Sequence, residues 1–268
     1  MSPMFKIVAT DLDGTLLRSE YGVSPRTVEV VRAVQETGAL VVPVTARPPK
    51  VTFPVAEQFA IRGVAVCANG ALLVDLDSRK ILDRRPLATD IVRRVIETMR
   101  SAAPGVLFAC EDGLEYRCEP GYPTIVPVDD RIECDAMEFL EITISKLVVK
   151  HPSMPAAELR EIAARAVGAL ASTDNSGPEW VEVHAVGVTK ATMLADLAAS
   201  RGVDASQVIA FGDYTTDVPM LRWAGHGVAP ANAFPAALEA ADQVCPSNDE
   251  DGVAQVLERL LSDGMLGR

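Results

Sequence analysis

The sequence predicts an α/β protein with a Rossmann-like parallel-sheet core, helices on both faces of that sheet, and an inserted α+β domain. Three observations support this fold class. Strand and helix patterns alternate over residues 5–80, short strands and helices mix in the middle of the chain, and the first pattern resumes from Val188. A strand, a helix and a second strand in that order form a βαβ unit, whose two strands run parallel.

The first elements follow from residue type and periodicity. KIVAT, residues 6–10, is a short β-branched run, and the next helix begins with Ser24 as N-cap and Pro25 at its first position. The apolar runs ALVVPVTA and GVAVCANGALL, residues 39–46 and 63–73, are typical of strands buried on both faces. We therefore expect both runs to contribute strands to the parallel sheet.

The middle of the chain combines a hairpin, two helices and several short strands. ALLVDLDSRKILDRR predicts a hairpin that turns near Asp77–Arg79, and TDIVRRVIETMRSA and AAELREIAARAVGALA are helical patterns. Strand-like pieces lie in VLFACED, ISKLVVKH and WVEVHAV. This mixture covers roughly a hundred residues, which is the size of a domain. We divide the chain into a first core segment (1–83), an inserted α/β domain (84–186) and a second core segment (187–268).

After the insertion, the pattern of the first segment returns. TKATMLADLAASRG is a helix that ends at Gly202, QVIAFGD is an apolar strand that ends in an aspartate, and VPMLRWAG is a short helix. GHGVAP, ADQVCP and a final helix, DGVAQVLERLLSDG, complete the chain. Both ends of the chain are therefore expected to build one core.

Composition and charge argue against several classes of partner. The formal net charge is −12, which disfavours binding to nucleic acid or to an anionic membrane, because both need clustered positive charge. The five cysteines form no CxxC pair, no signal peptide precedes the first strand pattern, and no apolar run is long enough to span a bilayer. We expect a cytoplasmic protein with reduced thiols, either a monomer or a homodimer.

Polar side chains follow the expected strands at the points where they end. These are the places where open α/β sheets bind their ligands. Lys190 stands at the start of a helix nearby in sequence. The strand-end groups are Asp11 with Asp13, Thr45 with Arg47, Asn69 with Gly70, and Asp213 with Asp217.

Gathered carboxylates at one sheet edge predict a cation site and a nucleophile. Several carboxylates repel one another unless a hard cation such as Mg²⁺ neutralises them. An aspartate beside that ion can attack phosphorus, and a second acid two residues on can move the proton. Asp11 and Asp13 have this spacing, although aspartates also commonly cap turns after strands. Thr45, Arg47 and Lys190 could hold a phosphate group, and each is also an ordinary residue at its position.

Four segments in order resemble the motifs of the haloacid dehalogenase (HAD) superfamily. They are DLDGTLL, VVPVTAR, GVTKATML and GDYTTDVPML. NGALL and NDEDGVAQVLERL are similar to features of its Cof-type (HAD-IIB) branch, and the middle domain resembles that branch's C2-type cap by position, length and α/β mixture. The resemblance covers residues 5–85 and 187–260.

The resemblance implies a Mg²⁺-dependent phosphatase that acts through an aspartyl-phosphate. By motif, Asp11 is the nucleophile and a metal ligand, and Asp13 is the general acid and base and binds metal through its backbone carbonyl. Thr45 and Lys190 hold the phosphate, and Asp213 and Asp217 supply the acidic metal ligands. The implied substrate is a small phosphorylated metabolite, such as a sugar phosphate. There are two alternatives. One is a phosphotransferase such as a sugar phosphomutase, and the other is a catalytically weakened binding or regulatory protein.

Two departures from the family pattern bear on this expectation. Thr216 stands where the fourth motif usually has Asn, so a shorter hydroxyl replaces an amide that helps order the metal ligands. Pro230 and Ala231 alter a loop near the site. In the cap, Glu182 and His184 of WVEVHAV either face the core as specificity residues or are exposed on an alternating strand.

Overall fold

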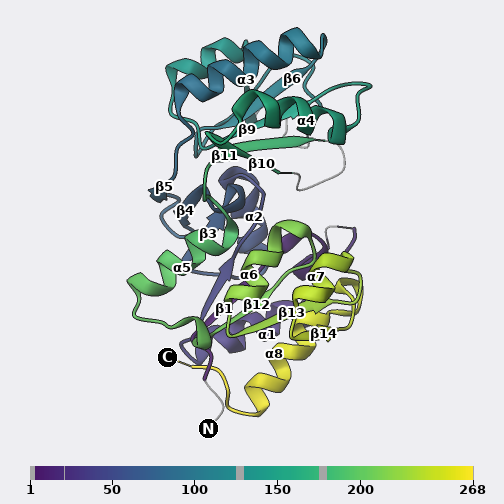
Figure 1. Cartoon of the computed structure of the whole chain (residues 1–268). Helices are drawn as coiled ribbons and strands as arrows, with labels where there is room; N and C mark the ends of the chain where they lie inside the picture. The colour runs from purple at the N-terminus through teal and green to yellow at the C-terminus, as the bar shows by residue number, and fades with distance from the viewer. Residues whose placement is uncertain (1–3, 21, 125–129, 175–179, 268) are drawn as a thin grey trace.

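The computed structural model describes residues 4–20, 22–124, 130–174 and 180–267. Figure 1 shows two lobes, with both chain ends at the base of the lower one. The lower lobe contains a five-stranded sheet and the upper lobe a six-stranded sheet, and a three-stranded sheet lies between them. The chain passes from the lower lobe to the upper one and back, as expected for a core with an insertion.

The five-stranded core sheet is parallel throughout. Its order is β14 (Gln243–Cys245), β13 (His226–Pro230), β12 (Val208–Phe211), β1 (Ile7–Thr10) and β2 (Leu40–Pro43). All four neighbouring pairs run parallel. Thr10 pairs with both Phe211 and Pro43, so three strands end at one edge. Residues that follow these strands therefore share the same edge of the sheet.

Helices cover both faces of this sheet, and the side chains of β1 alternate between them. On one face Val8 joins the cluster of α1 (Pro25–Glu36) and α8 (Gly252–Ser262). On the other face Ile7 and Ala9 pack with α5, α6 and α7. Their bounds are Lys190–Ser200, Val218–Trp223 and Pro235–Ala240. The Rossmann-like core is thus two helical layers around one buried sheet.

The three-stranded sheet corrects one expectation. β3 (Val64–Cys67) was expected in the parallel sheet, but it pairs antiparallel with β4 (Leu72–Asp75), which pairs antiparallel with β5 (Ile81–Arg84). A single parallel bridge, Val44 to Val66, joins it to the edge after β2. An apolar run specifies burial and not its partner, and the short connection after Cys67 turns the chain straight back. The predicted hairpin over residues 71–85 is confirmed.

The upper lobe is a six-stranded sheet with helices on one face. Its order is β10 (Ala171–Asp174), β11 (Val181–Ala185), β9 (Lys146–Lys150), β6 (Leu107–Glu111), β7 (Tyr116–Cys118) and β8 (Arg131–Glu133). The helices α3 (Thr89–Ala102) and α4 (Ala156–Val167) pack on it through one apolar cluster. The predicted helices and strands of this region are confirmed. The boundary expected after residue 83 falls inside β5, and the division into domains stays a prediction.

Two further observations concern the chain as a whole. No helix in the described ranges is both long and apolar enough to cross a membrane. All five cysteines are free thiols. One helix, α2 (Pro49–Gln58), was not assigned from the sequence. Pro49 occupies the first helical position, where its missing N–H costs nothing.

Candidate active site

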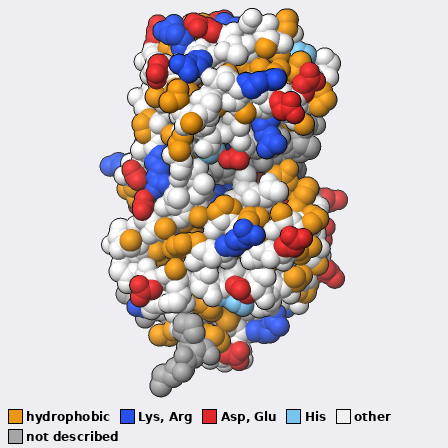
Figure 2. All heavy atoms as spheres, viewed as in Figure 1, with side chains coloured by type: hydrophobic (Ala, Val, Ile, Leu, Met, Phe, Trp, Pro, Cys, Tyr) orange, Lys and Arg blue, Asp and Glu red, His pale blue; other side chains and the backbone are white. Residues whose placement is uncertain are grey.

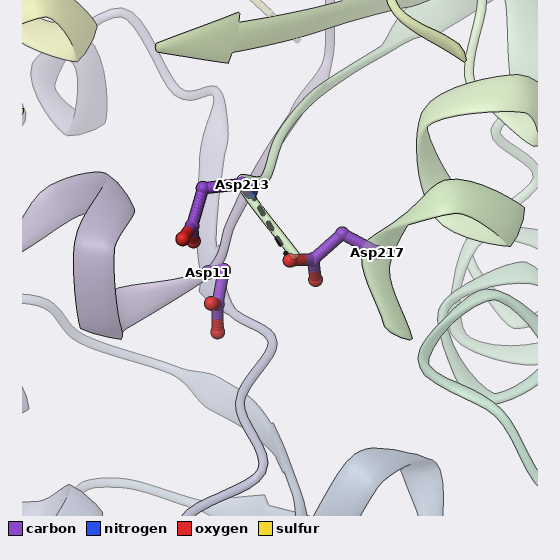
Figure 3. Close-up of side chains that lie close together, drawn as sticks. All are labelled: Asp11, Asp213 and Asp217. Carbon is purple, nitrogen blue, oxygen red and sulfur yellow. Dashed lines mark hydrogen bonds between the residues drawn. The ribbon is translucent and has the colours of Figure 1, made fainter. Parts of the chain in front are cut away.

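Three aspartates meet at the carboxyl edge of the core sheet. Asp11 follows β1, Asp213 lies two residues beyond the neighbouring strand β12, and Asp217 is the N-cap of α6. One carboxylate oxygen from each lies within 4.8 Å of the others, and the residues are 5%, 8% and 0% exposed. Figure 3 shows the three side chains converging, with Asp213 N–H bonded to Asp217. Parallel neighbouring strands that end together therefore bring distant acids to one point.

Lys190 links two of these acids. Its Nζ lies 2.9 Å from Asp11 Oδ1 and 2.6 Å from Asp217 Oδ1. The other oxygen of Asp217 accepts hydrogen bonds from the backbone N–H groups of Asp213 and Tyr214, at 3.2 and 3.0 Å. Thr15 Oγ1 donates to Asp213 Oδ1 at 2.7 Å. The cluster therefore has a fixed geometry before any ligand binds.

Two glycines permit this close assembly. Gly70 has φ +97°, and a Cβ there would lie 2.1 Å from the backbone oxygen of Thr189, the N-cap of α5. Gly14 has φ +74°, and a Cβ there would lie 2.4 Å from Asp213 Oδ2. Only glycine adopts such a backbone freely and leaves this space. Gly70 thus contributes by letting the start of α5, and with it Lys190, approach the sheet.

Burial and crowding control the charge of the acids. Burial raises the pKa of Asp11 well above its usual range against the lowering effect of Lys190, and Asp217 and Asp213 raise it further. Burial and then Asp217 raise the pKa of Asp213 to about 6. Burial acts to lower the pKa of Lys190, but Asp11 and Asp217 outweigh it, so that pKa is raised. One ammonium does not balance three buried carboxylates, and a hard divalent cation with oxygen ligands fits this donor set.

Asp13 stands apart from the three-acid cluster. Its two oxygens accept hydrogen bonds from Arg47 Nε and Nη2 at 2.7 and 2.5 Å. Both side chains line the same cavity as Asp11. The two predicted acids of the first motif therefore have different surroundings: Asp11 is buried against Lys190, and Asp13 is held at the cavity by a guanidinium group.

That cavity has a volume of about 920 Å³ and is lined by residues of both lobes. Figure 2 shows side chains of both charge signs along the waist between the lobes. The predicted residues among its lining are Asp11, Asp13, Arg47, Glu182, Lys190, Asp213 and Thr216. The lining also includes residues that the sequence did not single out, among them Glu111, Lys146, Trp180, Asn232 and Asn248.

Five predicted site residues do not line the cavity, and one of them, Asp217, belongs to the three-acid cluster described above. Thr45 is fully buried, and its Oγ1 accepts a hydrogen bond from Arg47 N at 3.1 Å. Asn69 donates to Glu182 Oε2 at 2.7 Å, so it supports a residue that does line it. Gly70 acts through packing, as described above. His184 is paired with Asp174 at 2.7 Å.

The alternative that Glu182 and His184 are exposed on an alternating strand is wrong. Each is 2% exposed, because β11 lies inside the sheet and its polar side chains find partners. Asn232 and Asn248 could have been found from the family pattern. Asn232 Nδ2 donates to Gly14 O at 2.8 Å and its Oδ1 accepts from Asn248 N at 2.9 Å, so this pair steadies the loop beside Asp13.

The model of the family described as haloacid dehalogenase-like hydrolases matches residues 8–257. The chain belongs to this family. It is 28% identical to the 5-amino-6-(5-phospho-D-ribitylamino)uracil phosphatase YcsE of Bacillus subtilis, over 94% of each chain. It is 26% identical to the pyridoxal phosphate phosphatase YbhA of Escherichia coli, over 94% of this chain and 97% of that one.

Solved structures of the family share the whole architecture. A haloacid dehalogenase-like hydrolase from Bacteroides thetaiotaomicron superposes with a TM-score of 0.83 at 27% identity, over 96% of this chain and 99% of that one. The predictions of the family, the fold class and the hydrolase class are therefore confirmed. The roles of individual residues stay predictions.

Proposed function

We propose that this chain is a Mg²⁺-dependent phosphatase that hydrolyses a small phosphorylated metabolite through an aspartyl-phosphate on Asp11. One observation carries the proposal: Asp11 lines a cavity between the lobes while Lys190, Asp213 and Asp217 surround its carboxylate. Phosphoryl transfer needs mainly positioning and neutralisation of charge. This arrangement supplies both, and the names of the related phosphatases agree with it.

The reaction divides between two carboxylates. In the first step an oxygen of Asp11 attacks phosphorus, the bond to the leaving oxygen breaks, and Asp13 gives that oxygen a proton. In the second step Asp13 takes a proton from water, the water oxygen attacks phosphorus, and the bond to Asp11 breaks. The products are an alcohol and inorganic phosphate, and both acids return to their starting state.

The remaining residues bind and orient. Lys190 neutralises negative charge on Asp11 and on the phosphoryl group. Arg47 binds Asp13 here, and an arriving phosphate dianion offers the guanidinium a second partner. Thr45 accepts one hydrogen bond at Oγ1, so its O–H can donate to a phosphoryl oxygen. Asp11, Asp213, Asp217 and the backbone carbonyl of Asp13 would hold Mg²⁺, which would neutralise negative charge on the phosphoryl group.

The test is phosphate release by the full chain from a panel of phosphomonoesters that includes sugar phosphates and pyridoxal phosphate. Release should require Mg²⁺, stop on chelation, and be lost in Asp11→Asn. Asp263→Asn, on the exposed end of α8, is the matched control and should keep full activity. Turnover that survives in Asp11→Asn would falsify the assigned nucleophile. Transfer of the phosphate to an added alcohol without free phosphate would favour a phosphotransferase.

A further inference from the structure

The six-stranded sheet has two faces of opposite character. Side chains alternate along each strand, so every second residue of β6, β9 and β11 points to the same face. The face under α3 and α4 is apolar, with Phe108, Cys110, Leu147, Val149, Val181 and Val183. The other face lines the cavity opposite the aspartates, and its strand residues include Glu111, Lys146, Val148, Lys150 and Glu182. We call this second set, together with Tyr116, Tyr122 and Trp180, the cap wall.

One end of the cap wall is charged, and almost all of its polar atoms have hydrogen-bond partners. Lys146 Nζ lies 2.7 Å from Glu182 Oε1, 3.0 Å from Glu111 Oε1 and 2.7 Å from the backbone oxygen of Ala46. These contacts use all three donors of the ammonium. Glu182 Oε2 accepts from Asn69 Nδ2. Glu111, Lys146 and Glu182 are each 2% exposed or less.

Two buried oxygens of this cluster, Asn69 Oδ1 and Glu111 Oε2, have no hydrogen-bond partner among the described residues, and of the two residues only Glu111 lines the cavity. A buried carboxylate oxygen without a partner is costly and rare, which points to a group that arrives from outside the chain. Burial also raises the pKa of Glu111 to about 7, against the lowering effect of Lys146. An N–H or O–H donor on a ligand would satisfy this oxygen.

The other end of the cap wall is aromatic. The chain has four Tyr and two Trp, and Tyr116, Tyr122, Tyr214 and Trp180 all line this one cavity. Tyr116, Tyr122 and Val148 share an apolar cluster, with Trp180 and Val51 packed against it. Lys150 Nζ lies 4.8 Å from the Trp180 ring centroid and 5.9 Å from that of Tyr122. Such a surface favours a flat, polarisable group over a ligand that needs a hydrogen bond for every hydroxyl.

We propose that the cap wall selects a phosphomonoester whose leaving group is a planar ring carrying an N–H or O–H donor, and that Glu111 Oε2 accepts a hydrogen bond from this donor. The ring packs on the aromatic end while its phosphate faces Asp11. This proposal rests on the proposed phosphatase function, because it describes the leaving group of that reaction. It makes Glu111 a specificity residue and not a residue of the chemical step.

The experiment compares four kinds of phosphate ester, all made on a primary alcohol, which differ in the group that this alcohol carries. Benzyl phosphate has a ring without a donor, the aminobenzyl phosphates (all three ring isomers) add an N–H donor, pyridylmethyl phosphates present an acceptor, and glucose 6-phosphate has hydroxyls without a planar ring. For the wild type we expect kcat/KM to fall in the order aminobenzyl, benzyl, glucose 6-phosphate. At about pH 8, where Glu111 is ionised, the best aminobenzyl isomer should exceed benzyl phosphate by about tenfold, which is one charge-assisted hydrogen bond.

Glu111→Gln provides the decisive variant. Lys146 requires an acceptor, so the amide oxygen turns to it and the amide N–H₂ takes the place of Oε2. The aminobenzyl advantage should vanish, and a pyridylmethyl isomer should rise above benzyl phosphate. Glu97→Gln, the same change on the exposed side of α3, is the control and should leave all ratios as in the wild type. Trp180→Leu should lower kcat/KM for the ring esters more than for glucose 6-phosphate.

Failure of this proposal is separable from failure of the proposed function. Equilibrium binding of the same esters to Asp11→Asn with Mg²⁺ reports the subsite without turnover, and the ratios of Kd should follow the same order. Glucose 6-phosphate that matches or exceeds the ring esters would overturn the ring class. An unchanged aminobenzyl-to-benzyl ratio in Glu111→Gln would overturn the role of Glu111. Absence of Asp11-dependent release with intact binding ratios would overturn only the phosphatase.

Discussion

The two lobes contain the same motif with different outcomes: a buried lysine between two carboxylates. In the core, Lys190 contacts Asp11 and Asp217, and a third acid, Asp213, joins them. In the cap, Lys146 contacts Glu111 and Glu182 and turns its last donor to a backbone oxygen of the core. The extra acid leaves the core cluster short of positive charge, which suits a cation. The cap cluster has no third acid among the described residues, and the open oxygen of Glu111 suits a neutral donor.

Replacing each of the two lysines tests the comparison between the clusters and should give the largest change in stability. Lys190→Met and Lys146→Met each leave two buried carboxylates without their ammonium, which should cost about 3–5 kcal/mol of the free energy of unfolding. Mg²⁺ should restore part of this loss for Lys190→Met, because a cation can replace the ammonium beside three acids. It should restore none for Lys146→Met. Denaturant unfolding with Mg²⁺ and with a chelator measures both, and equal rescue of the two variants would contradict the distinction.

The pH dependence of stability sharpens the description of the cap cluster. Burial raises the pKa of Glu111 from 4.5 to about 7. A raised carboxyl pKa favours the protonated folded state, so its contribution to stability is complete below pH 4.5 and is lost as the pH rises to about 7. The loss is about 3 kcal/mol over that window. The side chain in Glu111→Gln cannot ionise. The free energy of unfolding of this variant should therefore rise relative to that of the wild type by the same amount over this pH window. The measurement is the free energy of unfolding of both proteins as a function of pH. Two parallel curves would contradict the effect of burial on Glu111.

Gly70→Ala perturbs the core cluster without removing a charge. The added Cβ would lie 2.1 Å from Thr189 O, so the start of α5 must move and Lys190 with it. We expect a loss of at least about 2 kcal/mol in stability, together with lower kcat. Gly202→Ala is the control, because its φ of +66° is also left-handed but nothing lies within 4 Å of the added Cβ. It should lose about 1 kcal/mol and keep its activity.

Thr216→Asn should give the smallest effect. Thr216 lines the cavity where the family pattern has Asn. Restoring the amide should tighten Mg²⁺ binding by up to about tenfold, or about 1.4 kcal/mol, through better-ordered ligands. Titration of Mg²⁺ by calorimetry measures the change in Kd. An unchanged or weaker Kd would show that the hydroxyl already serves the site.

The sequence was sufficient where local pattern and motif spacing coincide. Ser24 caps α1 and accepts from Thr27 N, and α3 covers the predicted residues 89–102. The meeting of Asp11 with Asp213 followed from two strands that end in aspartates. Such features depend on neighbours in the chain or on the common edge of a parallel sheet.

What the sequence did not reveal depends on long-range pairing. Glu182 was ambiguous because its partners, Asn69 and Lys146, lie 113 and 36 residues away. Glu111 gave no signal at all, since a glutamate in VLFACED resembles any residue at a strand end. β3 was misassigned because its apolar run is equally suited to a parallel or an antiparallel neighbour. These features emerge only when the two lobes face each other.

The contact of Lys146 with Ala46 has a consequence for the timing of turnover. Together with the buried bond from Asn69 to Glu182, this partly buried contact joins the lobes. A separation of the lobes would break both bonds at once, at about 1–3 kcal/mol each if water does not replace them. If the lobes open to release product, these two bonds add to the barrier of that step, and we expect weakening either bond to speed product release.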